Sequence, residues 1–162
     1  MKKLVLVLIA LFFTTTLHFS QVDEEKSNDS DKQFIRVSID GSLKEFGVTT
    51  SAAVLGSTHI NGSLDGPDGQ EALKISLPGT DIGVFDFGSG ASAMYMGSGG
   101  TWQASEKAFD YGARLIVEIH EYDEYAIGTF NGTLVKMNIS SGSWLTLELE
   151  DGEFSIPVQK DK

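Results

Sequence analysis

The segment from Glu118 to Glu124, EIHEYDE, places a carboxylate two residues from a histidine. If this segment is a β-strand, Glu118 and His120 project from the same face, because alternate side chains point the same way. A pair of this kind would bind a metal ion or act as a base with its orienting carboxylate. The sequence identifies no third partner for them. The polar outer face of a half-exposed strand explains the same residues.

A second candidate is the acidic, glycine-rich segment DGPDGQE. Asp65, Asp68 and Glu71 would supply oxygen ligands on a flexible turn, as Ca²⁺ requires. The segment lacks the regular spacing of a calcium-binding loop, however, and Asp, Gly and Pro are also the usual residues of turns. We therefore interpret it first as a turn and keep calcium binding as the alternative.

The sequence contains no motif for nucleophilic catalysis or phosphate binding. Serine is plentiful, but no G-x-S-x-G elbow occurs. Glycines cluster between Gly83 and Gly100 without the lysine and hydroxyl residue that complete a phosphate-binding loop. We predict no catalytic residue, no cofactor and no enzymatic activity.

Six aromatic side chains lie in or beside expected turns, where exposed rings would contact a protein or glycan partner. The same rings would alternatively cap the open ends of a core. They are Tyr95, Trp102, Tyr111, Tyr122, Tyr125 and Trp144.

Composition excludes several classes of protein. The chain of 162 residues has no cysteine, which rules out disulfides, thiolate zinc sites and a cysteine nucleophile. Asp and Glu number 23 against 12 Lys and Arg, for a formal net charge of -11. This charge repels phosphate backbones, so we expect no nucleic-acid partner.

The N-terminus has the organisation of a secretory signal peptide. Lys2 and Lys3 precede an unbroken apolar run from Leu4 to Phe13, which is too short to span a bilayer. We predict a signal peptide over residues 1–21 with cleavage near Ser20, the alternative being an uncleaved anchor. The mature protein would be secreted or periplasmic, without membrane insertion.

The remainder divides into an acidic linker, one domain and a short tail. Residues 22–33 are nearly all polar and should form a disordered linker. The domain would occupy residues 34–158, followed by a tail at 159–162. Apolar residues alternate with polar ones in several short runs of this domain, as in half-buried antiparallel strands. We expect one all-β domain, an antiparallel β-sandwich, or alternatively a small closed or partly open β-barrel.

Two hairpins are expected from turn residues and register. Asp151-Gly152 suits a two-residue type I′ turn, which would set Leu149 opposite Phe154. A turn at Asp123-Glu124 would set Val117 opposite Phe130 and Ile119 opposite Gly128. Single helical turns are expected at residues 51–55 and 105–109.

The order of these segments resembles an uncharacterised family of small exported or lipid-anchored all-β bacterial domains. The resemblance rests on FIRVSIDG (34–41), LKISLPG (73–79), GVFDFG (83–88), AIGTFNGTL (126–134) and DGEF (151–154). Many members carry a lipid-anchoring cysteine, which this chain lacks, so free secretion is expected. The resemblance implies a fold and a compartment, and it implies no activity or functional residue.

Two functions are expected from these observations. The first is a secreted or envelope-associated binding module for a protein or glycan partner. The second is a structural component of the envelope or extracellular matrix without a discrete ligand. The sequence gives no indication of the oligomeric state.

Overall fold

A computed structural model describes residues 32–49, 53–54, 56–66, 69–97 and 99–158. The predicted signal peptide, nearly all of the linker and the tail lie outside the described residues. The strands are β1 (Phe34–Ile39), β2 (Ser42–Val48), β3 (Ala53–Val54), β4 (Ser57–Gly66), β5 (Gly69–Pro78), β6 (Gly83–Phe85), β7 (Ser92–Gly97), β8 (Gly100–Ala104), β9 (Arg114–Tyr122), β10 (Tyr125–Met137) and β11 (Trp144–Pro157).

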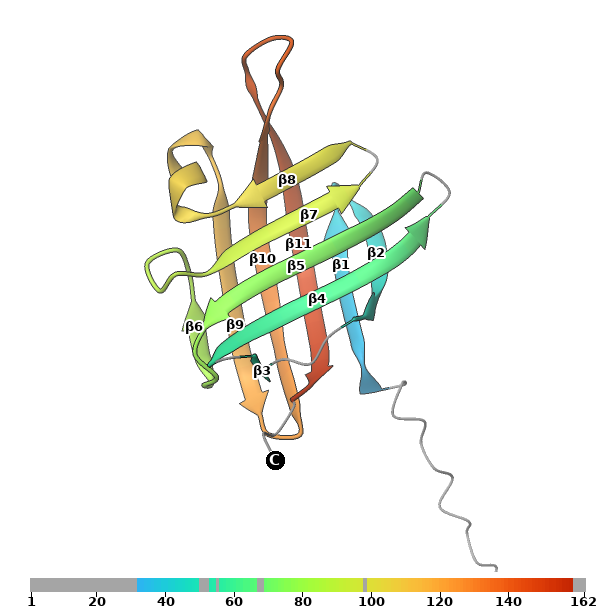
Figure 1. The fold of residues 1–162 in the computed structure, drawn as a ribbon, viewed down its shortest axis with the longest axis vertical. Helices are drawn as coiled ribbons and strands as arrows, with labels where there is room; N and C mark the ends of the chain where they lie inside the picture. The colour runs from blue at the N-terminus through green and yellow to red at the C-terminus, as the bar shows by residue number, and fades with distance from the viewer. Residues whose placement is uncertain (1–31, 50–52, 55, 67–68, 98, 159–162) are drawn as a thin grey trace, which may run out of the picture.

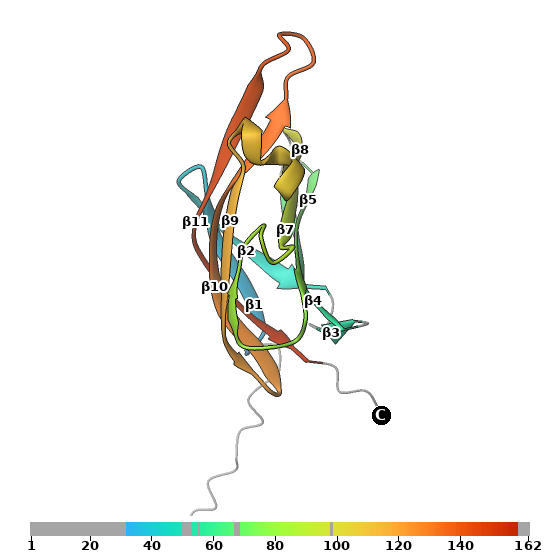
Figure 2. The same ribbon diagram turned by 90° about the vertical axis from the view of Figure 1, so that its left-hand side faces the viewer.

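The sheet closes on itself into an antiparallel barrel of eight strands. Its strands follow one another around the barrel in chain order, β1, β2, β4, β5, β7, β8, β10 and β11, and β11 pairs with β1 to complete the ring. The barrel is flattened, with β4, β5, β7 and β8 forming one wall and β9, β10 and β11 lying in the other (Figures 1 and 2). The all-β prediction is therefore confirmed, and the barrel alternative replaces the predicted sandwich.

Closure depends on two long strands at the end of the chain. β10 pairs with β8, β9 and β11, and β11 pairs with both β10 and β1. The sequence pattern divided the residues from Leu145 to Val158 into two short strands, whereas the structure has one strand from Trp144 to Pro157. As one continuous strand they are long enough to join the two walls.

The predicted hairpin at Asp151-Gly152 is wrong, because β11 runs straight through this dipeptide. Asp151 has a φ of 51° and forms a β-bulge, so that Glu150 and Asp151 together oppose Asn131. The Oδ1 atom of Asn131 accepts a hydrogen bond of 2.9 Å from the backbone N–H of Asp151. The side chain of Asn131 thus satisfies a group that the bulge removes from the ladder.

The other predicted hairpin is confirmed. β9 and β10 are joined at Asp123-Glu124, with Val117 opposite Phe130 and Ile119 opposite Gly128. A further Asp-Gly pair, at residues 40 and 41, forms the turn between β1 and β2, and both of its residues have positive φ, as a type I′ turn requires.

The core fills the barrel with apolar side chains from every strand of the ring. The predicted core residues are all buried in one cluster: Leu115, Val117, Ile119, Phe130, Leu147, Leu149, Phe154 and Ile156. Two cross-strand pairs place a glycine against a phenylalanine, Gly128 with Phe154 and Gly152 with Phe130. A Cβ atom on Gly152 would lie 2.6 Å from the Phe130 ring, so these glycines make room for the rings.

Short elements complete the structure. A 3₁₀ helix over Glu106–Tyr111 confirms the predicted helical turn after β8. At the other predicted turn, residues 53–54 form β3, and residues 51, 52 and 55 lie outside the described part of the chain. Among the described residues, no helix has the length and apolar character needed to cross a membrane.

Candidate functional site

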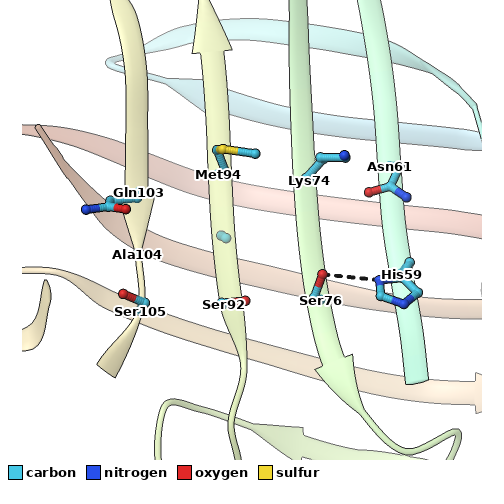
Figure 3. A pocket seen from close by; sticks show the side chains of 10 residues that line it. His59, Asn61, Lys74, Ser76, Ser92, Met94, Gln103, Ala104 and Ser105 are labelled. Carbon is cyan, nitrogen blue, oxygen red and sulfur yellow. Dashed lines mark hydrogen bonds between the residues drawn. The ribbon is translucent and has the colours of Figure 1, made fainter. Parts of the chain in front are cut away.

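A polar groove lies on the outer surface of the wall formed by β4, β5, β7 and β8. Two rows of cross-strand neighbours line it, since directly paired residues of antiparallel strands project from the same face. The first row runs His59, Ser76 and Ser92 and continues to Ser105, which directly follows β8, and the second runs Asn61, Lys74, Met94 and Gln103. Figure 3 shows both rows. We call the surface formed by these eight residues the outer-face groove.

The hollow arises from the sizes of these side chains. The first row holds three serines, Ser76 on β5, Ser92 on β7 and Ser105 directly after β8. Longer side chains stand beside them, including His59 and Met94. The result is an open depression of about 430 Å³ with three serines among the residues that line it. A ligand lying in it would meet hydrogen-bonding groups from four strands.

The polar groups of the groove include one preformed contact. Nδ1 of His59 and Oγ of Ser76 lie 3.2 Å apart, within hydrogen-bonding distance (Figure 3). No residue lining the groove carries a carboxylate, so the histidine has no acidic partner there of the kind that orients a catalytic base.

The backbone around Ser76 also lacks the features of a nucleophile site. β5 is paired with β4 on one side and β7 on the other, and Ser76 lies opposite His59 and Ser92. Its neighbouring N–H groups are therefore engaged in the sheet and do not form an oxyanion hole. The arrangement suits binding through side chains better than acyl transfer.

The candidate calcium ligands do not converge in the described part of the chain. Asp65 is the partner of Gln70 on the outer face, whereas Glu71 is the partner of Leu64 and points into the barrel. Asp68 lies outside the described residues.

Glu71 belongs instead to a polar cluster at one end of the barrel interior. Nζ of Lys44 donates to both of its carboxylate oxygens at 2.7 Å, and the hydroxyl of Tyr95 donates to Oε2 at 2.6 Å. Tyr95 reaches Glu71 by passing over Gly97, where a Cβ atom would lie 2.7 Å from Cζ of the ring.

Electrostatics in this cluster favour one protonation state. Burial of Glu71 disfavours the carboxylate, but the hydrogen bonds from Lys44 and Tyr95 and the charge of Lys44 outweigh it and lower the pKa of Glu71. Burial raises the pKa of Tyr95, and the hydrogen bond to Glu71 and the negative charges of Glu71 and Asp40 raise it further. The cluster is therefore an ionised Lys-Glu pair with a neutral phenol.

Glu118 and His120 lie on the outer face of β9, as predicted, with Oε1 and Nδ1 3.6 Å apart. Their side chains are 52% and 48% exposed. Within the part of the chain that the structure describes, no group of three or more His, Cys, Asp or Glu residues is placed to hold a metal ion. The pair is thus a contact between neighbours on a solvated surface.

The six candidate aromatics divide between interior and surface. Tyr95, Trp102 and Tyr125 are buried, beyond the reach of a partner. The hydroxyl of Tyr122 lies 3.1 Å from Oγ1 of Thr58, which is fully buried. These four residues occupy the positions expected of rings that cap the core.

The remaining two aromatics form a stacked pair. The rings of Tyr111 and Trp144 are nearly parallel, with centroids 4.1 Å apart. Tyr111 is 48% exposed, and Trp144 is half-buried. Tyr111 belongs to the 3₁₀ helix and Trp144 to β11, and neither lines the outer-face groove.

A second, more apolar hollow of about 380 Å³ lies beside β9 and is lined by Phe87, Phe109, Arg114 and Ile116 among others. Arg114 lies over the Phe109 ring at 4.1 Å and donates to the carbonyls of Phe109 and Ala113. Because its one cationic group is already engaged in these contacts, this hollow offers a ligand fewer polar groups than the groove.

No family model, curated protein or solved structure matches this chain. The resemblance to a family of exported domains therefore stays a prediction. Sequence reasoning missed the outer-face groove, since its residues are ordinary polar members of alternating strands. The signal that was present is the repeated serine at outward positions of β5 and β7.

Proposed function

We propose that this protein is a non-catalytic binding module of the exported compartment, and that it holds a glycan in the outer-face groove. The observation that carries the proposal is the convergence of hydroxyl, amide, imidazole and ammonium groups from four strands on one hollow. Saccharides present many hydroxyl groups that both donate and accept hydrogen bonds. Side chains such as Ser76, Asn61 and Gln103 offer the same combination.

A glycan fits the groove better than a folded protein partner does. Stable protein interfaces are large, and their buried centres are rich in aromatic and apolar anchors. Most of the side chains that line the groove are polar, and Met94 is its one large apolar side chain. The groove is also shallow and open, as an extended polar chain requires.

A structural component without a ligand is the alternative, and it would assemble through open strand edges. Closure of the barrel gives each of its eight strands a partner on both sides, and among the described strands the short β3 and β6 have a partner on one side only. This arrangement favours a binding module over an assembly built by edge pairing.

The export signal that supports the compartment is the basic and apolar sequence at residues 2–13. N-terminal sequencing of the mature protein tests it. A chain beginning near Gln21 is expected, and an intact Met1 on most of the protein would contradict export with cleavage.

Binding is tested by titration calorimetry against a panel of neutral and acidic oligosaccharides. Ser92→Trp should fill the groove and abolish binding without affecting the core, because Ser92 points outward. Leu43→Trp, at an exposed position of β2, is the matched control and should bind as the parent does. Equal binding by both variants, or no binding to any saccharide, would overturn the proposal.

A further inference from the structure

Three rows of outward neighbours on the wall that carries the groove hold no acidic side chain, and the next row holds Asp65, opposite Gln70. A third row of outward neighbours, Ser63, Ala72, Met96 and Thr101, extends the two rows of the groove. None of these twelve positions holds Asp or Glu, although the whole chain has 23 acidic and 12 basic residues. Lys74 stands in the middle row and is exposed.

The groove continues beyond its first row into a second hollow of about 220 Å³. The two hollows share Ser92 and Ser105, and the second is also lined by Lys107, with Glu106 beside it as the one carboxylate. An extended ligand would therefore meet a lysine in each hollow, with serine hydroxyls between them.

This distribution of charge favours an anionic glycan over a neutral one. A net charge of -11 repels anions from most of the surface, so an anionic ligand approaches best where acidic side chains are absent. An ammonium group forms charge-assisted hydrogen bonds to a carboxylate, and these are about twice as strong as neutral ones. A neutral glycan would accept hydrogen bonds from either lysine but would lack the attraction between two opposite charges.

We infer that the ligand is a carboxylated oligosaccharide, with one carboxylate on Lys74, its hydroxyls on the serine row and a further carboxylate toward Lys107. This inference rests on the proposed function, because it names the class of glycan that the same groove would take.

Calorimetric titration with oligogalacturonate and with maltohexaose, a neutral oligosaccharide, tests the inference. Oligogalacturonate should bind more tightly, and its affinity should fall as sodium chloride is raised, because salt screens exposed charges. Equal affinity for both saccharides, with both lost in Ser92→Trp, would overturn the inference while leaving the proposed function intact. Failure of oligogalacturonate to bind would overturn the inference, whereas the proposed function is overturned only if no saccharide of the wider panel binds.

The matched variants are Lys74→Gln and Arg36→Gln. Both remove one positive charge, but Arg36 lies on β1 beside Glu45, outside the groove. Lys74→Gln should weaken oligogalacturonate binding by about tenfold, the loss expected for one hydrogen bond to a charged group. Arg36→Gln should change it by less than about twofold, since an exposed charge at a distance is largely screened. Equal losses in the two variants would show that only net charge matters and would overturn the inference.

Discussion

The Lys44, Glu71 and Tyr95 side chains form a cluster whose energy depends on burial. Exposure of the ion pair is 21% at Lys44 and 12% at Glu71, whereas the Arg36–Glu45 pair on the outer face is 48% and 62% exposed. The protein therefore has one ion pair that is largely buried, Lys44–Glu71, and one that is exposed to solvent, Arg36–Glu45. The two pairs offer a direct comparison of what burial contributes.

Glu71→Gln should lower the free energy of unfolding at neutral pH by about 1–3 kcal/mol, because it leaves Lys44 and Tyr95 without their charged acceptor. Glu45→Gln should cost less than about 1 kcal/mol, since exposed ion pairs contribute little. Urea denaturation of the two variants measures this difference. Equal costs would mean that the interior cluster is as well solvated as the surface pair.

The pH dependence of stability gives a second test of the cluster. The pKa of Glu71 is lowered in the folded state, so its contribution is fully present above the unfolded pKa of about 4.3 and is lost as pH falls through the lower folded value. Parent protein should therefore lose stability below about pH 4.3, and Glu71→Gln should show a smaller loss over the same range. Parallel curves for parent and variant would contradict the assigned pKa shift.

The positions of single side chains were the hardest part of the site to predict from the sequence. Glu71 and Tyr95 were candidates for calcium and partner binding because turns surround them, but the strand register turns both inward. The groove residues come from four strands separated along the chain. These residues come together through cross-strand pairs such as His59 with Ser76. The alternation of apolar and polar residues does not specify which residues pair.

At the scale of elements, one dipeptide produces two different structures. Asp40-Gly41 and Asp151-Gly152 both follow alternating strands, but only the first pair has positive φ at both residues. Before Asp151 the odd-numbered residues of β11, such as Leu149, point into the barrel. After it the even-numbered residues do, beginning with Gly152. A two-residue turn and a β-bulge both produce this change of phase, so the local sequence does not distinguish them.

The strands on either side of β11 determine that Asp151-Gly152 forms a bulge and not a turn. Both β1 and β10 pair with β11 across the bulge, and a hairpin at Asp151 would forfeit much of that pairing. The Asp123-Glu124 hairpin was predictable with its register because no longer strand competes for its residues.

Substitution at Asp151 tests the bulge. Its backbone is in the left-handed region, which costs a residue with a side chain about 1–2 kcal/mol relative to glycine. Asp151→Gly should therefore leave stability unchanged or raise it, whereas Asp151→Val should lower it by about 1–2 kcal/mol or more, since β-branched residues disfavour this conformation. Chemical denaturation measures both. A loss with glycine as large as that with valine would argue against the bulge.

At the scale of the whole molecule, the barrel is stabilised by one core to which every strand of the ring contributes. The alternation of apolar residues predicted this core correctly, including residues on both sides of the misassigned turn. The alternation did not predict that the sheet closes into a barrel, because a sheet with one apolar face suits a sandwich and a barrel equally well. Closure became apparent only from the pairing of β11 with β1.

Leu147 and Thr146 are adjacent residues on opposite faces of β11, and they test the core directly. Leu147→Ala should cost about 2–5 kcal/mol, because it removes buried methyl groups and leaves a cavity. Thr146→Ala, at an exposed position, should cost well under about 1 kcal/mol. Similar losses in denaturant melts would mean that the inward and outward faces of β11 have been exchanged.

The pairing of the first strand with the last also governs how the chain folds. Phe34 lies opposite Ser155, so this contact spans nearly the entire domain and carries the loop-closure entropy of a very long segment. Contacts so distant in sequence form late and make folding slow. A chain that stops before β11 would leave β1 and β10 with unpaired edges, and such edges pair readily with other chains. Nascent or truncated chains should therefore aggregate until the C-terminal strand is in place, which makes β11 the segment on which productive folding depends.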